Sequence, residues 1–259
     1  MTKTIMKFTT AALLAMGMMT SVAQAEDVAV GGDIGVYSQY VWRGVEQTVN
    51  STAVQGDLGV SMGGLSAGVW FSNTYPAGAP QYAGKDVVEF DWTVDYSGDI
   101  GDTGLGYSVG GIAYTYLYDS ASNFPELYLG LSADTMLAPS LTAYYTVSDS
   151  QNKAYLAGDM WIDLGVSGSA AGFDLSGTVS YAIWKNDVTN RPVGAVDTFK
   201  DGLSLLTLGV SKDIEVGGVT MTPSLTYTHP LAKKMADGER YIYGLPVKSE
   251  FIAGLNMAF

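Results

Sequence analysis

Apolar and polar residues alternate along most of the chain, and the clearest example lies between residues 88 and 97. There the apolar residues Val88, Phe90, Trp92, Val94 and Tyr96 alternate with Glu89, Asp91, Thr93, Asp95 and Ser97. Successive side chains of a β-strand point to opposite faces of the sheet. This segment therefore predicts a strand with one apolar and one polar face.

The same alternation recurs between clusters of Gly, Asp, Asn, Ser and Pro, at intervals that suit membrane-spanning strands of ~9 to 11 residues. We expect strands at residues 28–43, 53–62, 65–74, 86–97, 104–117, 125–134, 140–149, 154–168, 173–186, 202–213, 219–228 and 248–259. Bacterial outer-membrane barrels have even strand numbers of this order. The pattern predicts an all-β fold, a transmembrane antiparallel up-and-down β-barrel of about 12 strands.

The connections between these strands alternate between a short class and a mostly longer class. The short ones are expected near residues 63–64, 99–103, 135–139, 169–172 and 214–218. Short turns face the periplasm in bacterial barrels and longer loops face outward, which places both chain ends on the periplasmic side. Among the longer connections, 186–201 and 230–246 could fold over the outer mouth, but we favour the alternative that they are flexible surface loops.

The last strand has an apolar residue at every second position from Phe251 to Phe259, where the chain ends. We expect it to close the barrel by pairing with the first strand near residues 28–42. Such an aromatic-ended strand resembles those by which the barrel-insertion machinery recognises outer-membrane proteins. The predicted partners are therefore that machinery, the outer-membrane lipid and its lipopolysaccharide. A soluble β-sandwich also alternates, but it does not need closure by its final strand.

The first 25 residues have the pattern of a secretory signal peptide. Lys3 and Lys7 precede an apolar run at residues 11–19, and small residues follow at 21–25. The apolar run is shorter than the ~20 residues of a membrane-spanning helix. We expect cleavage after Ala25, a single barrel domain at residues 26–259, and a location in the outer membrane of a Gram-negative cell.

Composition and charge exclude several function classes. The chain has 32 glycines, 17 tyrosines, one histidine, no cysteine and a formal net charge of −13. Cleavage would make the charge −15, since it would remove Lys3 and Lys7 and no acid. So acidic a chain is not expected to bind nucleic acid. Neither a nucleotide-binding loop nor a metal-ligand motif occurs, so we expect no metal and no cofactor.

The expected register turns one set of charged residues toward the barrel interior. These lumen or constriction candidates are Asp33, Arg43, Asp57, Glu89, Asp91, Asp95, Glu126, Asp163, Asp174 and Glu250. Carboxylates lining a water-filled pore favour cations. The hypothesis is a porin-like channel for passive diffusion of small hydrophilic solutes, with a preference for cations. A barrel of about twelve strands lies between barrels filled by side chains and barrels with an open channel, so we expect a narrow pore.

Aromatic residues near the strand ends are the expected contacts with the two membrane interfaces. The membrane-girdle candidates are Trp42, Trp92, Tyr96, Tyr227 and Phe259. Trp and Tyr favour these interfaces because one part of each side chain is apolar and another part hydrogen-bonds.

Two stretches near the beginning of the barrel carry a family resemblance. The stretch YSQYVWRGVEQT at Tyr37–Thr48, followed by AVQGDLGVSMGGLSAGVWFSN at Ala53–Asn73, resembles the opening of the TorF family of porins. The resemblance implies a small outer-membrane barrel that acts as a porin, and it implies no catalytic residue. Arg43 is open to two interpretations, one as a residue that faces Glu46 or the lumen acids and shapes a constriction, the other as a neighbour of Trp42 at the rim.

Two other functions compete with transport. A nonconducting barrel could serve adhesion or envelope structure through its outer loops. A hydrolase of the outer membrane would need a serine beside a histidine base, and His229 is the sole histidine of the chain. Because His229 precedes Pro230 at a strand-to-loop junction, we expect a rim residue that is solvated or hydrogen-bonded to its loop, and we expect no enzyme activity.

Overall fold

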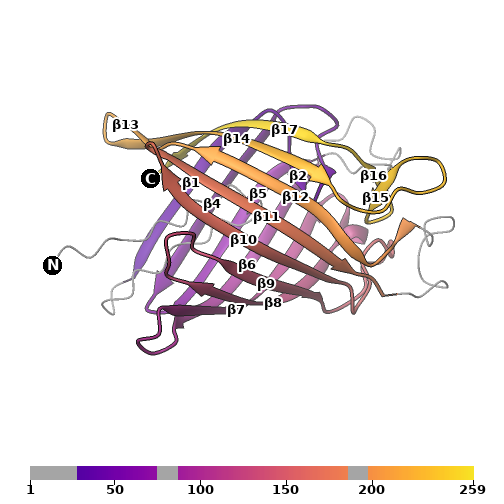
Figure 1. Cartoon of the computed structure of the whole chain (residues 1–259), viewed down its shortest axis with the longest axis horizontal. Helices are drawn as coiled ribbons and strands as arrows, with labels where there is room; N and C mark the ends of the chain where they lie inside the picture. Colours follow the sequence, from indigo (N-terminus) through magenta and orange to yellow (C-terminus); the bar gives the residue numbers. More distant parts are fainter. Residues whose placement is uncertain (1–27, 75–86, 186–197) are drawn as a thin grey trace.

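The computed structural model describes residues 28–74, 87–185 and 198–259, and its main feature is a closed antiparallel barrel of 12 strands (Figure 1). The barrel strands are β1 (Ala29–Tyr37), β4 (Ala53–Met62), β5 (Leu65–Thr74), β6 (Val87–Asp99), β7 (Leu105–Leu117), β8 (Phe124–Ala133), β9 (Ser140–Thr146), β10 (Met160–Ala170), β11 (Phe173–Ile183), β12 (Gly202–Ser211), β14 (Val219–Pro230) and β17 (Glu250–Ala258). Each strand pairs with its neighbours in the chain, and β17 pairs with both β14 and β1. The predicted closure by the last strand is therefore confirmed.

Six short elements lie outside the twelve strands. They are β2 (Val41–Trp42), β3 (Val45–Glu46), the 3-10 turn η2 (Ser120–Ser122), β13 (Ile214–Val216), β15 (Arg240–Ile242) and β16 (Leu245–Val247). β13 extends the turn before β14, whereas β2 pairs with β3 and β15 with β16 as two separate hairpins. No helix in the described ranges is long and apolar enough to cross a membrane.

The short turns gather at one end of the barrel, where the chain also ends (Figure 1). We call this the periplasmic end, because short turns face the periplasm in bacterial barrels, and we call the opposite end the outer end. The predicted signal peptide at residues 1–25 lies outside the described residues.

Several predicted strands differ from the structure by one to three residues at an end, and two differ by more. The first was expected to run to residue 43, but β1 ends at Tyr37 because the chain then turns inward to form β2 and β3. The eighth was expected from residue 154, but β10 begins at Met160 because residues 147–159 form a folded loop. Both differences lie at the outer end.

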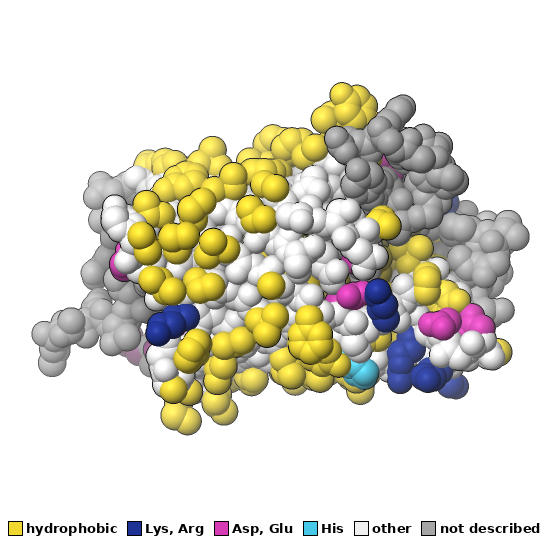
Figure 2. All heavy atoms as spheres, turned by 90° about the horizontal axis from the view of Figure 1, so that it is seen from above, with side chains coloured by type: hydrophobic (Ala, Val, Ile, Leu, Met, Phe, Trp, Pro, Cys, Tyr) yellow, Lys and Arg dark blue, Asp and Glu magenta, His cyan; other side chains and the backbone are white. Residues whose placement is uncertain are grey.

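The outer wall of the barrel is apolar, as the alternation predicts. In β8 the side chains of Leu127, Leu129 and Leu131 are about half exposed, whereas Glu126 and Tyr128 between and beside them are buried inside. Hydrophobic side chains cover much of the wall on the face seen in Figure 2. This wall fits a hydrocarbon environment, in which a closed barrel satisfies every backbone hydrogen bond.

A matched pair of substitutions on β6 tests this assignment of faces. Val94 points outward and is 57 % exposed, whereas its neighbour Thr93 points into the lumen between Asp91 and Asp95. We expect Val94→Arg to destabilise the barrel folded in a bilayer by about 2–4 kcal/mol. The control Thr93→Arg gains acidic neighbours and should cost clearly less. Equal losses in urea titrations of the two variants in lipid vesicles would contradict the assignment.

Glycines on the inner wall leave room for two tyrosine rings. A Cβ on Gly110 would collide with the ring of Tyr128, and one on Gly254 would collide with the ring of Tyr37. Both rings therefore lie along the wall rather than across the lumen. Tyr128 then donates its hydroxyl hydrogen to Asp95 Oδ2 at 2.7 Å.

Candidate functional site in the barrel lumen

Two small hairpins fold into the outer half of the barrel. The first inner hairpin comprises residues 41–46 (β2 and β3), and the second inner hairpin comprises residues 240–247 (β15 and β16). Each has a two-residue turn in which both residues have positive φ: Arg43 (47°) and Gly44 (83°) in one, Tyr243 (52°) and Gly244 (75°) in the other. Such turns match the twist of a tight hairpin. Residues other than glycine rarely adopt this conformation, and they do so where surrounding contacts hold them.

The tips of the two inner hairpins meet. Arg43 Nη1 donates to Tyr243 Oη at 2.5 Å, across 200 positions of sequence. At the first tip, a Cβ on Gly44 would approach Leu205 Cδ1 to 2.9 Å and Ile242 Cδ1 to 3.2 Å. The positive φ and this close approach together require glycine at position 44.

Arg43 is joined to the barrel wall by a two-pronged ion pair. Its Nη1 donates to Glu126 Oε1 at 2.8 Å, and its Nη2 donates to Glu126 Oε2 at 2.7 Å. The side chains of Arg43 and Glu126 are only 8 % and 2 % exposed. Glu126 also accepts hydrogen bonds from Tyr114 Oη at 3.1 Å and Thr146 Oγ1 at 3.4 Å. Glu126 thus anchors the first hairpin to β7, β8 and β9 at one point.

Aromatic rings surround the guanidinium of Arg43. Its Cζ lies 4.6 Å from the ring centre of Trp42, 4.9 Å from that of Tyr144 and 5.3 Å from that of Trp161. We call the guanidinium's surroundings the aromatic cage, which consists of Trp42, Tyr114, Glu126, Tyr144, Trp161 and Tyr243. Aromatic faces attract cations, and the attraction is stronger where water is excluded.

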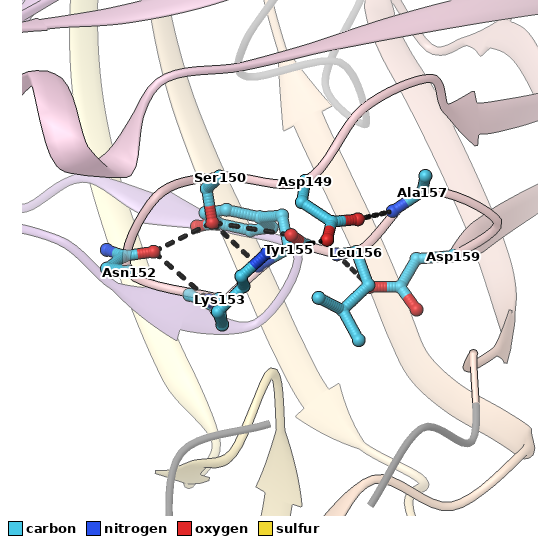
Figure 3. Close-up of polar contacts among 9 residues, drawn as sticks. Asp149, Ser150, Asn152, Lys153, Tyr155, Leu156, Ala157 and Asp159 are labelled. Atoms are coloured by element: carbon cyan, nitrogen blue, oxygen red, sulfur yellow. Dashed lines mark hydrogen bonds and ion pairs between the residues drawn. The ribbon is translucent and has the colours of Figure 1, made fainter. Parts of the chain in front are cut away.

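The outer loop at residues 147–159 contacts the cage through Tyr155. Figure 3 shows the polar contacts within this loop. Asp149 Oδ1 accepts from the Ala157 N–H at 2.8 Å, and Asp159 Oδ2 accepts from the Leu156 N–H at 2.9 Å. The loop closes through a backbone hydrogen bond from Ser150 to Tyr155 at 3.0 Å. These contacts hold Tyr155 in place, where its ring stacks on Phe124 and meets Trp42 edge-on at 5.9 Å.

Neighbouring charges and burial shift the pKa of Arg43 in opposite directions. Burial lowers the pKa of Arg43, but Glu126 and the neighbouring tyrosines outweigh it and hold that pKa well above its ordinary value. Burial raises the pKa of Tyr243 well above its ordinary value, although the adjacent Arg43 opposes the shift. Arg43 is therefore charged, and Tyr243 is neutral, over the pH range in which the protein would work.

Two further carboxylates lie on β6 beside the cage. Glu89 and Asp91 are each 1 % exposed, and Glu89 Oε1 accepts from Tyr116 Oη at 2.7 Å. Neither carboxylate oxygen of Asp91 has a hydrogen-bond partner among the described residues. The charges that act on Asp91 are those of Glu89, Glu126 and Arg43. Burying an ionised carboxylate without a hydrogen-bond partner is energetically unfavourable, so Asp91 has unused capacity to bind a cation or a donor.

The remaining lumen candidates also lie on the inner face, at several depths. Asp33 and Asp57 face each other across β1 and β4, and Asp95 follows on β6. Asp163 accepts from Trp161 Nε1 at 2.8 Å and from Ser180 Oγ at 2.6 Å.

Two of the candidates mark the ends of the lumen. Asp174 accepts from Ser169 Oγ near the periplasmic turns. Glu250 lies at the outer end, where it accepts from Gln39 Nε2 at 3.0 Å and pairs with Lys248 at 3.3 Å. The predicted acids therefore share one lumen, and Arg43 contacts Glu126 directly.

One girdle prediction is wrong. Trp42 is 5 % exposed and stacks on Tyr243 at 4.9 Å inside the barrel, because the inward turn at Arg43 and Gly44 carries it away from the membrane. The other candidates lie on the outer wall. Trp92 sits near the middle of β6, and Tyr96 lies closer to the periplasmic end of the same strand.

The last two girdle candidates lie at opposite ends of the barrel. Tyr227 packs on Phe251 near the outer end, with their ring centres 4.7 Å apart. Phe259 is 74 % exposed at the periplasmic end and exchanges backbone hydrogen bonds with Gly32.

Sequence reasoning missed the second inner hairpin and its Tyr243. Of the two alternatives for 230–246, the favoured surface loop is wrong for residues 240–246, which turn inward. A local signal was present at both hairpins, because Arg43-Gly44 and Tyr243-Gly244 are each flanked by short apolar or β-favouring segments. Most of the loop predicted at 186–201 lies outside the described residues, which resume at Thr198.

His229 lies outside the lumen. It shares the outward face of β14 with Tyr227, whereas Thr226 and Thr228 are buried inside. Its Nδ1 lies 2.7 Å from Ser249 Oγ and 3.4 Å from Tyr227 Oη. The expected rim residue therefore has a serine and a tyrosine as neighbours.

The sequence model of a known protein family matches most of the barrel sequence. The sequence profile described as "Bacterial protein of unknown function (Gcw_chp)" matches residues 22–229, which is more than half of the chain. The chain belongs to the Gcw_chp family. No curated protein matches this Gcw_chp chain.

Solved structures similar to this Gcw_chp protein are outer-membrane barrels. LpxR from Salmonella typhimurium has a TM-score of 0.51 and 10 % identity, with 88 % of this chain and 99 % of that chain covered. The NanC porin has a TM-score of 0.49 and 13 % identity over 89 % and 99 %. A mutant of the TodX monoaromatic hydrocarbon channel has a TM-score of 0.48 and 12 % identity over 97 % and 94 %. At such identities the likeness to LpxR supports the outer-membrane barrel fold alone.

Proposed function

We propose that this protein is an outer-membrane channel for passive diffusion of small hydrophilic solutes, with a preference for cations. The observation that carries the proposal is the inner wall, where acidic side chains from Asp33 to Glu250 line a lumen of small polar residues. Rings of carboxylates favour cations and repel anions. The resemblance of residues 37–73 to TorF porins points in the same direction.

The two inner hairpins make the channel narrow at its outer end. The residues between the hairpin tips and the wall are buried, whereas Asp33, Asp57 and Asp95 in the other half keep part of their surface exposed. The proposed channel therefore has a wetter periplasmic half that leads to a constriction at the aromatic cage.

The associated proposals concern export and membrane contacts. A signal peptide cleaved after Ala25 would take the chain to the outer membrane of a Gram-negative cell, and the strand ending at Phe259 would be recognised by the barrel-insertion machinery. Outer-membrane lipid and lipopolysaccharide would cover the apolar wall.

Liposome swelling tests solute passage with three amino-acid derivatives of similar size. We expect vesicles that contain the refolded protein to swell fastest with the cationic solute, more slowly with the neutral one and slowest with the anionic one. Vesicles prepared with the protein heat-unfolded are the control for leakage. Swelling no faster than this control for all three solutes would refute the channel.

A nonconducting barrel with an adhesive or structural role is the second candidate. The observation that favours it is the filled outer half of the lumen, where Trp42, Tyr243 and Tyr155 pack together. We rank it second because a plug that only fills the barrel needs no buried charge. Apolar packing at the same place would cost less than burying Arg43, Glu89, Asp91 and Glu126.

We do not propose catalysis at His229. A hydrolytic site of the serine–histidine type uses one ring nitrogen for the serine and the other for an orienting partner. Here Ser249 and Tyr227 both approach Nδ1. The geometry matches a hydrogen-bonded pair at the membrane rim better than a catalytic one.

A further inference from the structure

We propose that the aromatic cage is a binding site for the guanidinium group of a cationic solute, and that Arg43 occupies it as a resident competitor. This inference rests on the proposed channel and names the chemical class that its constriction would select. A solute guanidinium would take the place of Arg43 on Glu126, and the tip of the first inner hairpin would leave the constriction.

The chemistry of the cage fits a guanidinium and not a generic cation. The Glu126 carboxylate receives two parallel N–H donors at 2.8 and 2.7 Å, an arrangement that a planar fork makes and an ammonium does not. The faces of Trp42, Tyr144 and Trp161 lie 4.6 to 5.3 Å from the guanidinium carbon. Tyr114 and Thr146 hold Glu126 from the wall, so the carboxylate stays oriented when its partner changes.

The balance of charge provides an independent argument. Glu89, Asp91 and Glu126 are each at most 2 % exposed, and Arg43 is the basic residue that the described part of the chain brings among them. Asp91 has no hydrogen-bond partner for either oxygen there. The cluster holds three carboxyl groups against one basic side chain, and a buried carboxyl group needs a counter-ion to be ionised. A second cation would supply that counter-ion, and the ionised carboxylate would hold the cation beside Glu126.

The position of Arg43 makes exchange feasible. Its side chain comes from the tip of a six-residue hairpin, whereas Glu126, Tyr144 and Trp161 belong to strands of the wall. The wall part of the cage, formed by Glu126, Tyr144 and Trp161, would therefore stay in place, whereas Trp42 would move with Arg43 as part of the same hairpin.

The test measures binding of L-arginine to the full-length refolded protein in detergent micelles through tryptophan fluorescence, because Trp42 and Trp161 line the cage. L-citrulline is the matched neutral probe, since it replaces the guanidinium with a ureido group of the same shape, and L-lysine carries an ammonium instead. We expect saturable binding of L-arginine, weaker binding of L-lysine and none of L-citrulline. Equal responses to arginine and citrulline would overturn the proposal.

Two variants separate the competition between Arg43 and L-arginine from the attraction of L-arginine by the buried carboxylates. Arg43→Ala removes the resident competitor and should lower the Kd for L-arginine at least about tenfold. Asp91→Asn keeps the shape of the wall and should raise the Kd about tenfold, whereas Glu215→Gln on the exposed strand β13 should leave it unchanged. If Arg43→Ala does not refold, the comparison of Asp91→Asn with Glu215→Gln decides. Equal Kd values for these two variants would also overturn the proposal.

Binding and transport can fail separately. Saturable arginine binding without solute entry in the swelling assay would refute the channel and leave the cage as a ligand site. Solute entry with no discrimination between arginine and citrulline in the fluorescence assay would refute the cage and leave the channel.

Discussion

The Arg43→Ala variant should conduct ions several-fold better than the parent protein and should unfold more readily. The substitution removes the two hydrogen bonds to Glu126 and the one to Tyr243 that hold the hairpin tips together. It also leaves Glu126 buried without its counter-ion, a change that costs about 3–5 kcal/mol in comparable buried pairs. Both effects favour a state in which the first inner hairpin leaves the lumen. Single-channel currents and urea titrations of the refolded variant measure the two effects.

Two control variants make the result specific. Arg43→Lys keeps the charge but loses the planar fork, so its conductance and stability should lie between those of the parent and Arg43→Ala. Lys153→Ala breaks the ion pair with Asp149 on the outer loop, where both side chains are more than a third exposed, and should change neither property measurably. Parent-like currents and stability in Arg43→Ala would show that the ion pair does not hold the constriction closed.

The second large effect concerns selectivity. Asp33 and Asp57 face each other across β1 and β4 in the wetter half of the lumen, so their charges act on ions before the constriction does. The double variant Asp33→Asn, Asp57→Asn keeps the size of both side chains and removes both charges. We expect its permeability ratio of potassium over chloride to fall several-fold, as the reversal potential in a salt gradient would show.

An acid outside the lumen provides the control for this selectivity change. Asp149 lies on the outer loop and pairs with Lys153, so Asp149→Asn should leave the reversal potential near the parent value. An unchanged permeability ratio in the double variant would show that the paired aspartates do not act on permeating ions.

The strands of the barrel could be predicted from the sequence with little error. β4 and β5 match the predicted segments 53–62 and 65–74 residue for residue, because each has a strict alternation and a Gly63-Gly64 turn between them. The period of two also fixed which face each residue would occupy, and the inward positions of Glu89, Asp91 and Glu126 follow from it.

The aromatic cage could not be predicted in the same way. Its parts are distant in sequence, as Arg43 contacts Glu126 and Tyr243 contacts Arg43 from the other end of the chain. Alternation describes residues that lie in the wall, whereas Trp42 and Tyr243 belong to hairpins that leave it. The sequence indicates a turn at Arg43-Gly44, but it does not indicate whether the hairpin packs inside or outside the barrel. That choice depends on contacts with distant residues, here the buried carboxylate of Glu126 and several aromatic rings.

The most direct test of the account is a planar-bilayer recording of the refolded parent protein in a salt gradient. The account predicts small discrete currents with a reversal potential on the cation-selective side, because acidic residues line the lumen and the inner hairpins narrow it. A reversal potential on the anion-selective side, or a bilayer that stays silent with folded protein inserted, would contradict it.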